Sequence, residues 1–147
     1  MVTLYDSYNT KCIMENKPHD IPLPITFLIT DDHDALRESL ANWMHTLYPN
    51  IRILRAENGK QALQACEQYC PDFVLLDLKL PDIDGFALCQ QLIELCPAAE
   101  VFIMSIHEGE AYQRQALLSG AKGLLSKNTM VNELPLILTQ FMETKEY

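Results

Sequence analysis

Residues 73–85 read FVLLDLKLPDIDG, and this stretch decides the fold. Its apolar run, FVLLD at 73–77, ends on the carboxylate of Asp77, and Pro81 and Gly85 then turn the chain within eight positions. A short apolar run bounded by turn residues predicts a strand buried on both faces, hence a central strand of a sheet. A lone buried carboxylate is costly unless another group pairs with it, so the rest of the sequence should supply a partner for Asp77.

Strand-like and helical segments alternate on both sides of this stretch. The predicted strands are 25–30, 51–56, 73–77, 100–105 and 122–126, and the predicted helices are 34–48, 58–70, 84–96, 108–118 and 132–143. The last helix is expected to begin near Asn132, because Pro135 is tolerated in a first turn, where its missing N–H costs little. Strands joined by helical crossovers require a parallel sheet. We therefore expect an α/β fold, a doubly wound five-stranded parallel sheet with helices on both faces.

Length and composition are those of one globular domain. The chain has 147 residues, 48% of them hydrophobic, and a mean hydropathy of -0.04. Residues 1–24 are polar and proline-containing without periodicity, so we expect a flexible N-terminal arm at 1–24 and the folded domain at 25–147. No apolar run approaches the roughly 20 residues of a membrane span, and the N-terminus does not resemble a signal peptide. We expect no membrane contact and a cytoplasmic location.

The five cysteines show no CxxC spacing; they are Cys12, Cys66, Cys70, Cys89 and Cys96. Cys66 and Cys70 would lie one turn apart on a helix, which raises the question of a metal site. No histidine or second cysteine pair stands nearby with ligand spacing. We therefore expect reduced, half-buried thiols.

Polar side chains gather where the predicted strands end. Asp31 and Asp32 follow the first strand, Asp77 ends the third, Ser105 ends the fourth, and Lys127 follows the fifth. In a doubly wound sheet, ligands and chemistry lie beyond the carboxyl ends of the strands, so these groups should converge. Three close carboxylates repel by several kcal/mol at an effective dielectric of about 20. A divalent cation relieves that repulsion, and Mg²⁺ suits a site of carboxylates, one backbone carbonyl and waters.

Magnesium beside a carboxylate suggests phosphoryl transfer. A carboxylate can attack a phosphoryl group and form an acyl phosphate. Lys127 and the Ser105 hydroxyl would then bind phosphoryl oxygens. The net charge of -9 is compatible with such a site and argues against binding of this segment to a phosphate backbone. Asp82, Asp84 and Gly85 are expected to serve turns and caps, and we expect no chemical role for the histidines His33 and His45.

Five motifs in this order resemble the receiver domain of bacterial two-component response regulators. They are FLITDDHDALRESL (27–40), AENGKQAL (56–63), LLDLKLPDIDG (75–85), MSIHE (104–108) and SGAKGLLSK (119–127). Each motif alone is weak evidence, whereas the combination is specific and covers nearly all of residues 25–143. The resemblance implies a flavodoxin-like receiver fold. SGAKGLLSK and the ENGKQAL part are similar to receivers that carry a helix-turn-helix DNA-binding output domain.

The resemblance assigns a role to each strand-end residue. Asp77 would be the phosphorylated aspartate, with Lys127 and Ser105 as the catalytic lysine and the switch hydroxyl. Asp31, Asp32 and Asp77 would bind Mg²⁺ together with the backbone carbonyl of Lys79. Family members take the phosphoryl group from a histidine kinase or phosphotransfer protein, often dimerise through a helix face, and contact DNA only through an output domain, which is absent from this chain.

Two positions depart from the family pattern. The family usually has Tyr or Phe three residues before the lysine, where this chain has Leu124, so the aromatic readout of phosphorylation is in doubt. Asn128 follows the lysine where proline is common, so the peptide bond there need not be cis. Lys79 and His107 lie two residues beyond Asp77 and Ser105, and we expect them, like Leu124, to modulate the switch or the lifetime of the phosphoryl group.

Two other functions compete with this interpretation. Asp32 and Asp34 form the DxD of a haloacid-dehalogenase-type phosphatase, but the glycine and threonine of that motif are replaced, and Asp77 would have no role. The chain could also be a receiver-like interaction module that is not phosphorylated. In the preferred interpretation the chain is not an enzyme beyond self-catalysed phosphotransfer and autodephosphorylation, and its signal passes to transcription.

Overall fold

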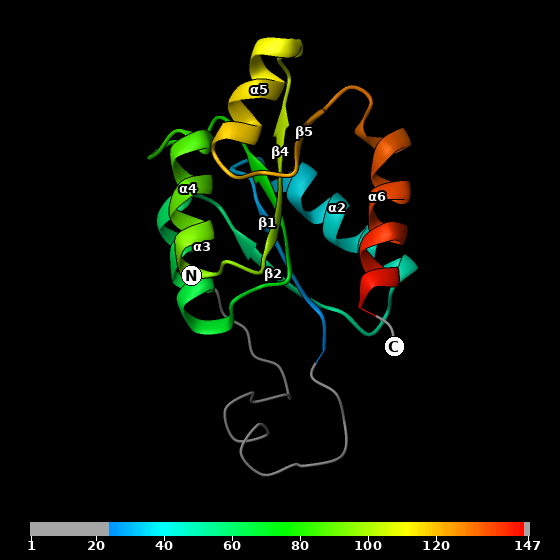
Figure 1. Ribbon diagram of the computed structural model, residues 1–147. Helices are drawn as coiled ribbons and strands as arrows, with labels where there is room; N and C mark the ends of the chain where they lie inside the picture. The colour runs from blue at the N-terminus through cyan, green and yellow to red at the C-terminus, as the bar shows by residue number, and fades with distance from the viewer. Residues whose placement is uncertain (1–23, 146–147) are drawn as a thin grey trace.

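The computed structural model describes residues 24–145 and contains one five-stranded parallel sheet (Figure 1). The strands are β1 Thr26–Thr30, β2 Arg52–Ala56, β3 Phe73–Asp77, β4 Glu100–Ser105 and β5 Gly123–Ser126. Their order in the sheet is β2-β1-β3-β4-β5, and every neighbouring pair is parallel. The predicted fold and the central position of β3 are therefore confirmed. The flexible arm predicted for residues 1–24 lies outside the described residues, apart from Pro24.

Helices cover both faces of the sheet. They are α2 Asp34–Leu47, α3 Gly59–Tyr69, α4 Gly85–Leu95, α5 Glu110–Leu118 and α6 Met130–Thr144. Figure 1 shows α3, α4 and α5 on one face and α2 and α6 on the other. None of the helices between residues 24 and 145 has both the length and the apolar character that a membrane span requires.

The two faces are packed with different side chains. Under α2 and α6 the rings of Phe27, Phe73 and Phe141 lie 5.1–5.8 Å apart, centroid to centroid. Under α3 and α4 the buried side chains include the small residues Ala62, Ala65, Cys66 and Cys89, besides leucines and valines. Small side chains let α3 and α4 approach each other closely. The C-terminal ends of the two helices are therefore also close together.

Helix α6 begins earlier than predicted. Its first residue is Met130 rather than Asn132, so Pro135 lies inside the helix, beyond the first turn. A proline there removes one backbone hydrogen bond to the carbonyl four residues earlier, that of Val131. Val131 is 71% exposed, so water can solvate the carbonyl that the proline leaves without a donor. Solvent access, which the local pattern does not report, explains why the helix continues through the proline.

Two aspartates hold the loop after β3 against the starts of two helices. Asp84 caps α4, where its side chain accepts a hydrogen bond from the Ala87 amide at 3.1 Å, as the sequence predicts. Asp82 instead reaches α3 and accepts hydrogen bonds from the amides of Gly59 and Lys60, at 2.8 and 3.0 Å. Burial opposes ionisation of Asp82, but hydrogen bonds from these two amides and from the backbone of Asp82 itself outweigh it and hold its pKa below the ordinary value. The loop is thus tied to both helices.

Two glycines make that close packing possible. A Cβ on Gly59 would overlap the Ile83 side chain. A Cβ on Gly85 would lie 2.6 Å from the Cα of Leu78 and 2.9 Å from the Asp77 carbonyl oxygen. At Gly85 the backbone itself passes too near for a side chain, and at Gly59 the Ile83 side chain fills the space. Both contacts restrict the position of the segment after Asp77.

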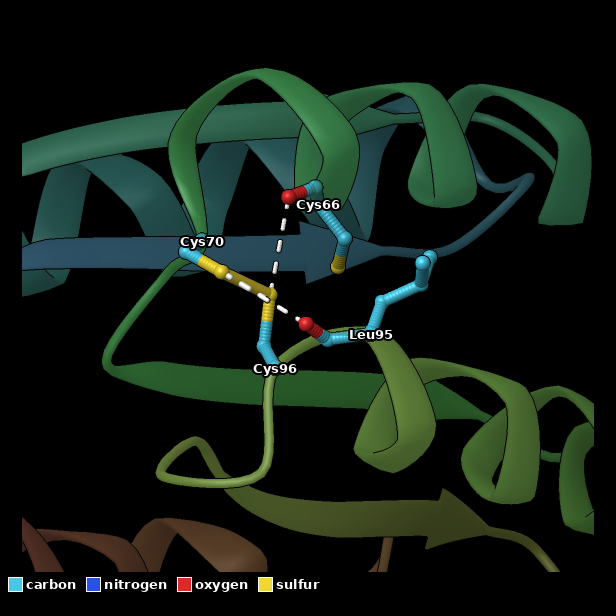
Figure 2. Close-up of a disulfide and its surroundings, with 4 residues drawn as sticks. All are labelled: Cys66, Cys70, Leu95 and Cys96. Carbon is cyan, nitrogen blue, oxygen red and sulfur yellow. Dashed lines mark hydrogen bonds between the residues drawn. A yellow bond between two sulfur atoms is a disulfide. The ribbon is translucent and has the colours of Figure 1, made fainter.

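Cys70 and Cys96 form a disulfide, which corrects the expectation of reduced thiols for this pair (Figure 2). The two residues are the C-caps of α3 and α4, and their Cα atoms lie 5.5 Å apart, a normal separation for a disulfide. Spacing along the sequence could not reveal this pairing, because it depends on α3 and α4 being neighbours. Cys66 and Cys89 are buried free thiols, as expected, and Cys12 lies outside the described residues.

Candidate functional site

Asp31, Asp77 and Lys127 meet at the carboxyl edge of the sheet. The Lys127 ammonium lies 3.1 Å from Asp77 Oδ1 and 3.2 Å from Asp31 Oδ2. Asp31 follows β1, Asp77 ends β3, and Lys127 follows β5, so three strands that are far apart in the sequence supply this cluster. Asp31 is fully buried and Asp77 is 5% exposed. The sequence predicts that another group pairs with the buried Asp77 carboxylate, and one such group is the Lys127 ammonium.

The cluster shifts the proton affinity of its members. Burial raises the pKa of Asp77 above its ordinary value, the Asp31 charge raises it further, and Lys127 offsets part of this. Burial by itself would lower the pKa of Lys127, but the two carboxylates outweigh that effect and raise it. Lys127 is therefore charged at neutral pH, whereas the environment of Asp77 opposes its negative charge.

Asp31 is held rigidly by neighbouring groups. Its backbone N–H donates to the Ala56 carbonyl at 3.1 Å, and its Oδ1 accepts from the His33 amide at 2.8 Å. The buried guanidinium of Arg37 donates from Nη1 to the Asp31 carbonyl at 2.8 Å and from Nη2 to Asp34 Oδ1 at 2.7 Å. Sequence reasoning missed Arg37. The available signal was its position on the first turns of a helix that starts directly after the acid pair.

The acid pair lies where a cation could bind. Ligand atoms of Asp31, Asp32 and His33 lie within 4.8 Å of one another, and Asp32 and His33 are exposed. The Asp31 and Asp32 carboxylates offer oxygen ligands of the kind that a hard divalent ion such as Mg²⁺ prefers. Asp77 is not part of this group of ligand atoms and is joined to Asp31 through the Lys127 ammonium. The sequence predicts no chemical role for His33, but the structure places its imidazole close to both acids. The Lys79 amide points to Asp77 Oδ1 at 3.5 Å, a long contact.

Ser105 lies on the neighbouring strand end and is 3% exposed. Its hydroxyl oxygen accepts a hydrogen bond from the His107 amide at 2.8 Å, and its carbonyl accepts one from the Lys127 amide at 2.8 Å. The His107 ring stacks on Tyr112 of α5, with centroids 5.2 Å apart and planes 8° from parallel. Ser105 is thereby connected to the lysine on one side and to α5 on the other.

Leu124, the position where the aromatic is missing, is 5% exposed within β5. The side-chain amide of Gln113 on α5 binds both backbone groups of Leu124: it donates to the carbonyl at 2.8 Å and accepts from the amide at 3.3 Å. A leucine in this packed site has no polar group to move toward solvent or toward Ser105. An aromatic ring that lies near the Ser105 end of the sheet, that of Tyr112, comes from α5 and not from β5.

This fold and this cluster define a class of protein. A family model described as the response regulator receiver domain matches residues 27–139, and the chain belongs to that family.

Individual relatives support the same assignment. The chain is 33% identical over 104 residues to the transcriptional regulatory protein DegU of Brevibacillus brevis, a match of 70% of this chain and 44% of DegU. It is 31% identical over 112 residues to the nitrate/nitrite response regulator protein NarL of Escherichia coli K12, a match of 76% of this chain and 51% of NarL. The chain thus spans about half the length of these curated relatives.

Solved structures share the fold. The signal receiver domain of the putative response regulator NarL from Mycobacterium tuberculosis is 27% identical with a TM-score of 0.70, covering 82% of this chain and 98% of that one. A response regulator from Burkholderia pseudomallei, solved with a phosphorylated aspartic acid, a calcium ion and citrate, is 26% identical with a TM-score of 0.70. That match covers 82% of this chain and 70% of the other.

Proposed function

We infer that this chain is a phosphoacceptor receiver domain of a two-component system, in which Asp77 accepts a phosphoryl group. The observation that carries the inference is the Lys127 ammonium between the Asp77 and Asp31 carboxylates, at 3.1 and 3.2 Å. The donor would be the phosphohistidine of a histidine kinase or of a phosphotransfer protein. The relative from Burkholderia pseudomallei, with its phosphorylated aspartic acid, supports the same chemistry for this family.

The reaction is a displacement at phosphorus. An Asp77 carboxylate oxygen attacks, the bond from phosphorus to the histidine nitrogen breaks, and its electron pair stays on the imidazole, which leaves an acyl phosphate on Asp77. Lys127 pairs with a phosphoryl oxygen in place of the carboxylate, and the Ser105 hydroxyl donates to another. Asp31, Asp32, Asp77 and the Lys79 carbonyl would hold Mg²⁺, which neutralises charge on the phosphoryl oxygens when bound.

Several groups are in position to carry the resulting signal. Once Ser105 Oγ turns toward the phosphoryl group, its hydrogen bond from the His107 amide must change. His107 stacks on Tyr112, so the change would pass to α5 and its surroundings. This route does not use Leu124. Lys79 and His107 also flank the phosphoryl position, and we expect substitutions there to change the rate at which water removes the phosphoryl group.

The output of the whole protein follows from its relatives. DegU is named a transcriptional regulatory protein, and this chain covers 44% of it. We propose that phosphorylation signals to transcription and that DNA is contacted through an output domain rather than through the receiver fold. We also propose that the chain works in the cytoplasm, with a homodimer as one form of the signal. The chain would catalyse its own phosphotransfer and autodephosphorylation and would have no multiple-turnover activity.

The two competing functions have different support. For the phosphatase, Asp34 would have to act with Asp32, but the Asp34 carboxylate is paired with Arg37 at 2.7 Å. For the interaction module, the supporting observation is the missing aromatic at Leu124, since the acids, the hydroxyl and the lysine are all retained.

A single experiment separates these functions. Incubation with acetyl phosphate and Mg²⁺, followed by intact-mass measurement, should add one phosphoryl group to the wild-type chain and none to Asp77→Asn. Asp84→Asn is the matched control, since it changes an acid of the same loop that caps α4, and it should still be labelled. No label on the wild type would support the interaction module, whereas steady release of phosphate from phosphate monoesters would support the phosphatase.

A further inference from the structure

Cys70 and Cys96 occupy equivalent positions on neighbouring helices. Each is the C-cap of its helix, α3 or α4, and each is followed by a proline, Pro71 or Pro97, which prevents the helix from continuing. Both helices end at the amino edge of the sheet, opposite Asp77, shortly before β3 and β4 begin. The disulfide therefore joins the C-terminal ends of two neighbouring helices (Figure 2).

The two cysteine residues differ in their exposure to solvent. Cys70 is exposed, whereas Cys96 is 3% exposed. Cys70 also adopts a left-handed backbone conformation, with φ of 45°, which is unfavourable for a residue other than glycine. We therefore expect a reagent from solution to reach the bond from the Cys70 side.

The surroundings also suit the reduced state. Cys96 Sγ lies 3.5 Å from the Cys66 carbonyl, and Cys70 Sγ lies 3.8 Å from the Leu95 carbonyl (Figure 2). Each carbonyl would accept a hydrogen bond from the corresponding thiol once the S–S bond is broken. Neither redox state leaves a buried sulfur group without a partner, so the site can change state without rebuilding the helix ends.

The disulfide completes a closed unit that includes the loop after Asp77. At their other ends α3 and α4 are joined through Asp82, which accepts hydrogen bonds from the Gly59 and Lys60 amides. With the disulfide formed, the helix pair is joined by a covalent bond at one end and by the Asp82 hydrogen bonds at the other. Without it, the cysteine end keeps only the two weaker contacts between a thiol and a carbonyl. The redox state of the cysteines therefore sets how freely α3 and α4 can move relative to each other.

We propose that Cys70–Cys96 is a thiol–disulfide exchange site for small thiols of the glutathione class. This proposal rests on one part of the proposed function, the cytoplasmic location, because disulfides in the cytoplasm are usually transient. A small thiolate attacks the Cys70 sulfur, the S–S bond breaks, and its electron pair leaves on Cys96, which takes a proton. A second thiolate attacks the small-molecule sulfur of the mixed disulfide and frees Cys70. In sum, the protein disulfide and two small thiols give the protein dithiol and one small disulfide; oxidation is the reverse.

Cys66 is not part of the exchange pair, although it lies one turn before Cys70. It is 2% exposed, and burial together with the charge of Glu67 raises its pKa to about 12. A thiol that remains protonated is a poor nucleophile. Cys66 thus offers a matched control: a third cysteine of the same region that should take no part.

The test measures exchange directly and requires no phosphoryl transfer, so its failure is distinct from a failure of the proposed function. The whole chain, with Cys12→Ser in every sample, is equilibrated with reduced and oxidised glutathione at a series of ratios, then alkylated and analysed by mass spectrometry. We expect Cys70 and Cys96 to change together from two alkylated thiols to none as the ratio becomes oxidising. In Cys96→Ser, a mixed disulfide with glutathione should accumulate on Cys70.

Further measurements test direction and consequence. In Cys70→Ser, Cys96 should form little mixed disulfide, because it is buried, and Cys66→Ala should titrate as the wild type does. Reduction should lower the midpoint of thermal unfolding by about 10 °C and raise amide hydrogen exchange in the last turns of α3 and α4. Two results would overturn the proposal: a bond that native protein keeps under fully reducing glutathione, or thiols that remain free under fully oxidising glutathione.

Discussion

The two edges of the sheet are stabilised in different ways. At the carboxyl edge, Asp31 and Asp77 share one ammonium, that of Lys127, and the burial of Asp77 opposes its charge. At the amino edge, a covalent bond between Cys70 and Cys96 joins two helix ends. The carboxyl edge holds the Asp77 carboxylate where burial disfavours its charge. At the amino edge, the disulfide limits how far the ends of α3 and α4 can separate. The proposed phosphoryl transfer at the carboxyl edge would account for this difference, since reactive sites are seldom optimal for stability.

The largest stability effect is expected at the amino edge. Cys70→Ser opens a covalent loop with a sequence separation of 26, which should lower the free energy of unfolding by about 3 kcal/mol under oxidising conditions. Urea unfolding measures the change. With excess reductant, the variant and the wild type should have the same stability. If Asp77→Asn cost as much, the contrast between the edges would be wrong.

Gly85→Ala should disturb the carboxyl edge by steric overlap. The new Cβ would lie 2.6 Å from the Cα of Leu78, and because backbone cannot rotate away, we expect a loss of about 2 kcal/mol. Acetyl phosphate labelling should also slow, since the same Cβ would lie 2.9 Å from the Asp77 carbonyl oxygen. Gly123→Ala is the control: its Cβ would lie 3.6 Å from the Phe102 ring, an ordinary contact, and little change is expected. Equal losses of stability in Gly85→Ala and Gly123→Ala would show that steric overlap in the loop after Asp77 is not the cause.

Asp82→Ala should have a smaller effect, because it removes the acceptor of two amides in the first turn of α3, while the N-cap residue Asn58 is kept. The amides of Gly59 and Lys60 lose their acceptor, and we expect about 1 kcal/mol less stability at neutral pH. The pKa of Asp82 is lowered in the folded state, so its contribution is present above the ordinary value of 3.8 and is lost as the pH falls through the folded pKa. The free energies of unfolding of the wild type and of Asp82→Ala should therefore converge as the pH is lowered. A difference that stays constant with pH would contradict a contribution from the ionised Asp82 side chain.

Asp77→Asn should change stability least, and in the opposite direction. The pKa of Asp77 is raised in the folded state, so its favourable contribution is complete below 3.8 and is lost as the pH rises through the folded pKa. Without divalent cations, the variant should be slightly more stable than the wild type at neutral pH, with the gap closing below pH 3.8. Added Mg²⁺ should favour the wild type, whose carboxylate can bind it. A less stable variant at neutral pH without Mg²⁺ would refute the electrostatic strain.

Much of this molecule follows from local patterns. The apolar run ending at Asp77 predicts a central buried strand, and β3 is central and bounded by Phe73 and Asp77. Alternation of strands with helices predicts a parallel sheet, and parallel strands bring their carboxyl ends to one edge. For that reason Asp31, Asp77, Ser105 and Lys127 could be named together without coordinates. The N-cap role of Asp84 follows in the same way, since its hydrogen bond spans three residues.

Helix boundaries were less predictable where solvent decides them. Helix α6 continues through Pro135 where Val131, four residues earlier, is exposed, and no periodicity records that exposure. Helix α5 begins at Glu110 rather than Glu108, because Gly109 takes a φ of 120° that cannot belong to a helix. Glycine permits that conformation but does not require it, so the sequence alone leaves the boundary open.

The sequence by itself determined the order of the elements, the parallel sheet and the residues at its carboxyl edge, because these depend on period, turn residues and a topological rule. Only the tertiary structure decided that Lys127 lies between Asp31 and Asp77, that Arg37 holds Asp31, and that Cys70 meets Cys96. Each of these contacts needs a distance and a direction in space. Those are fixed when α3 and α4 pack side by side and β1, β3 and β5 take their places in the sheet.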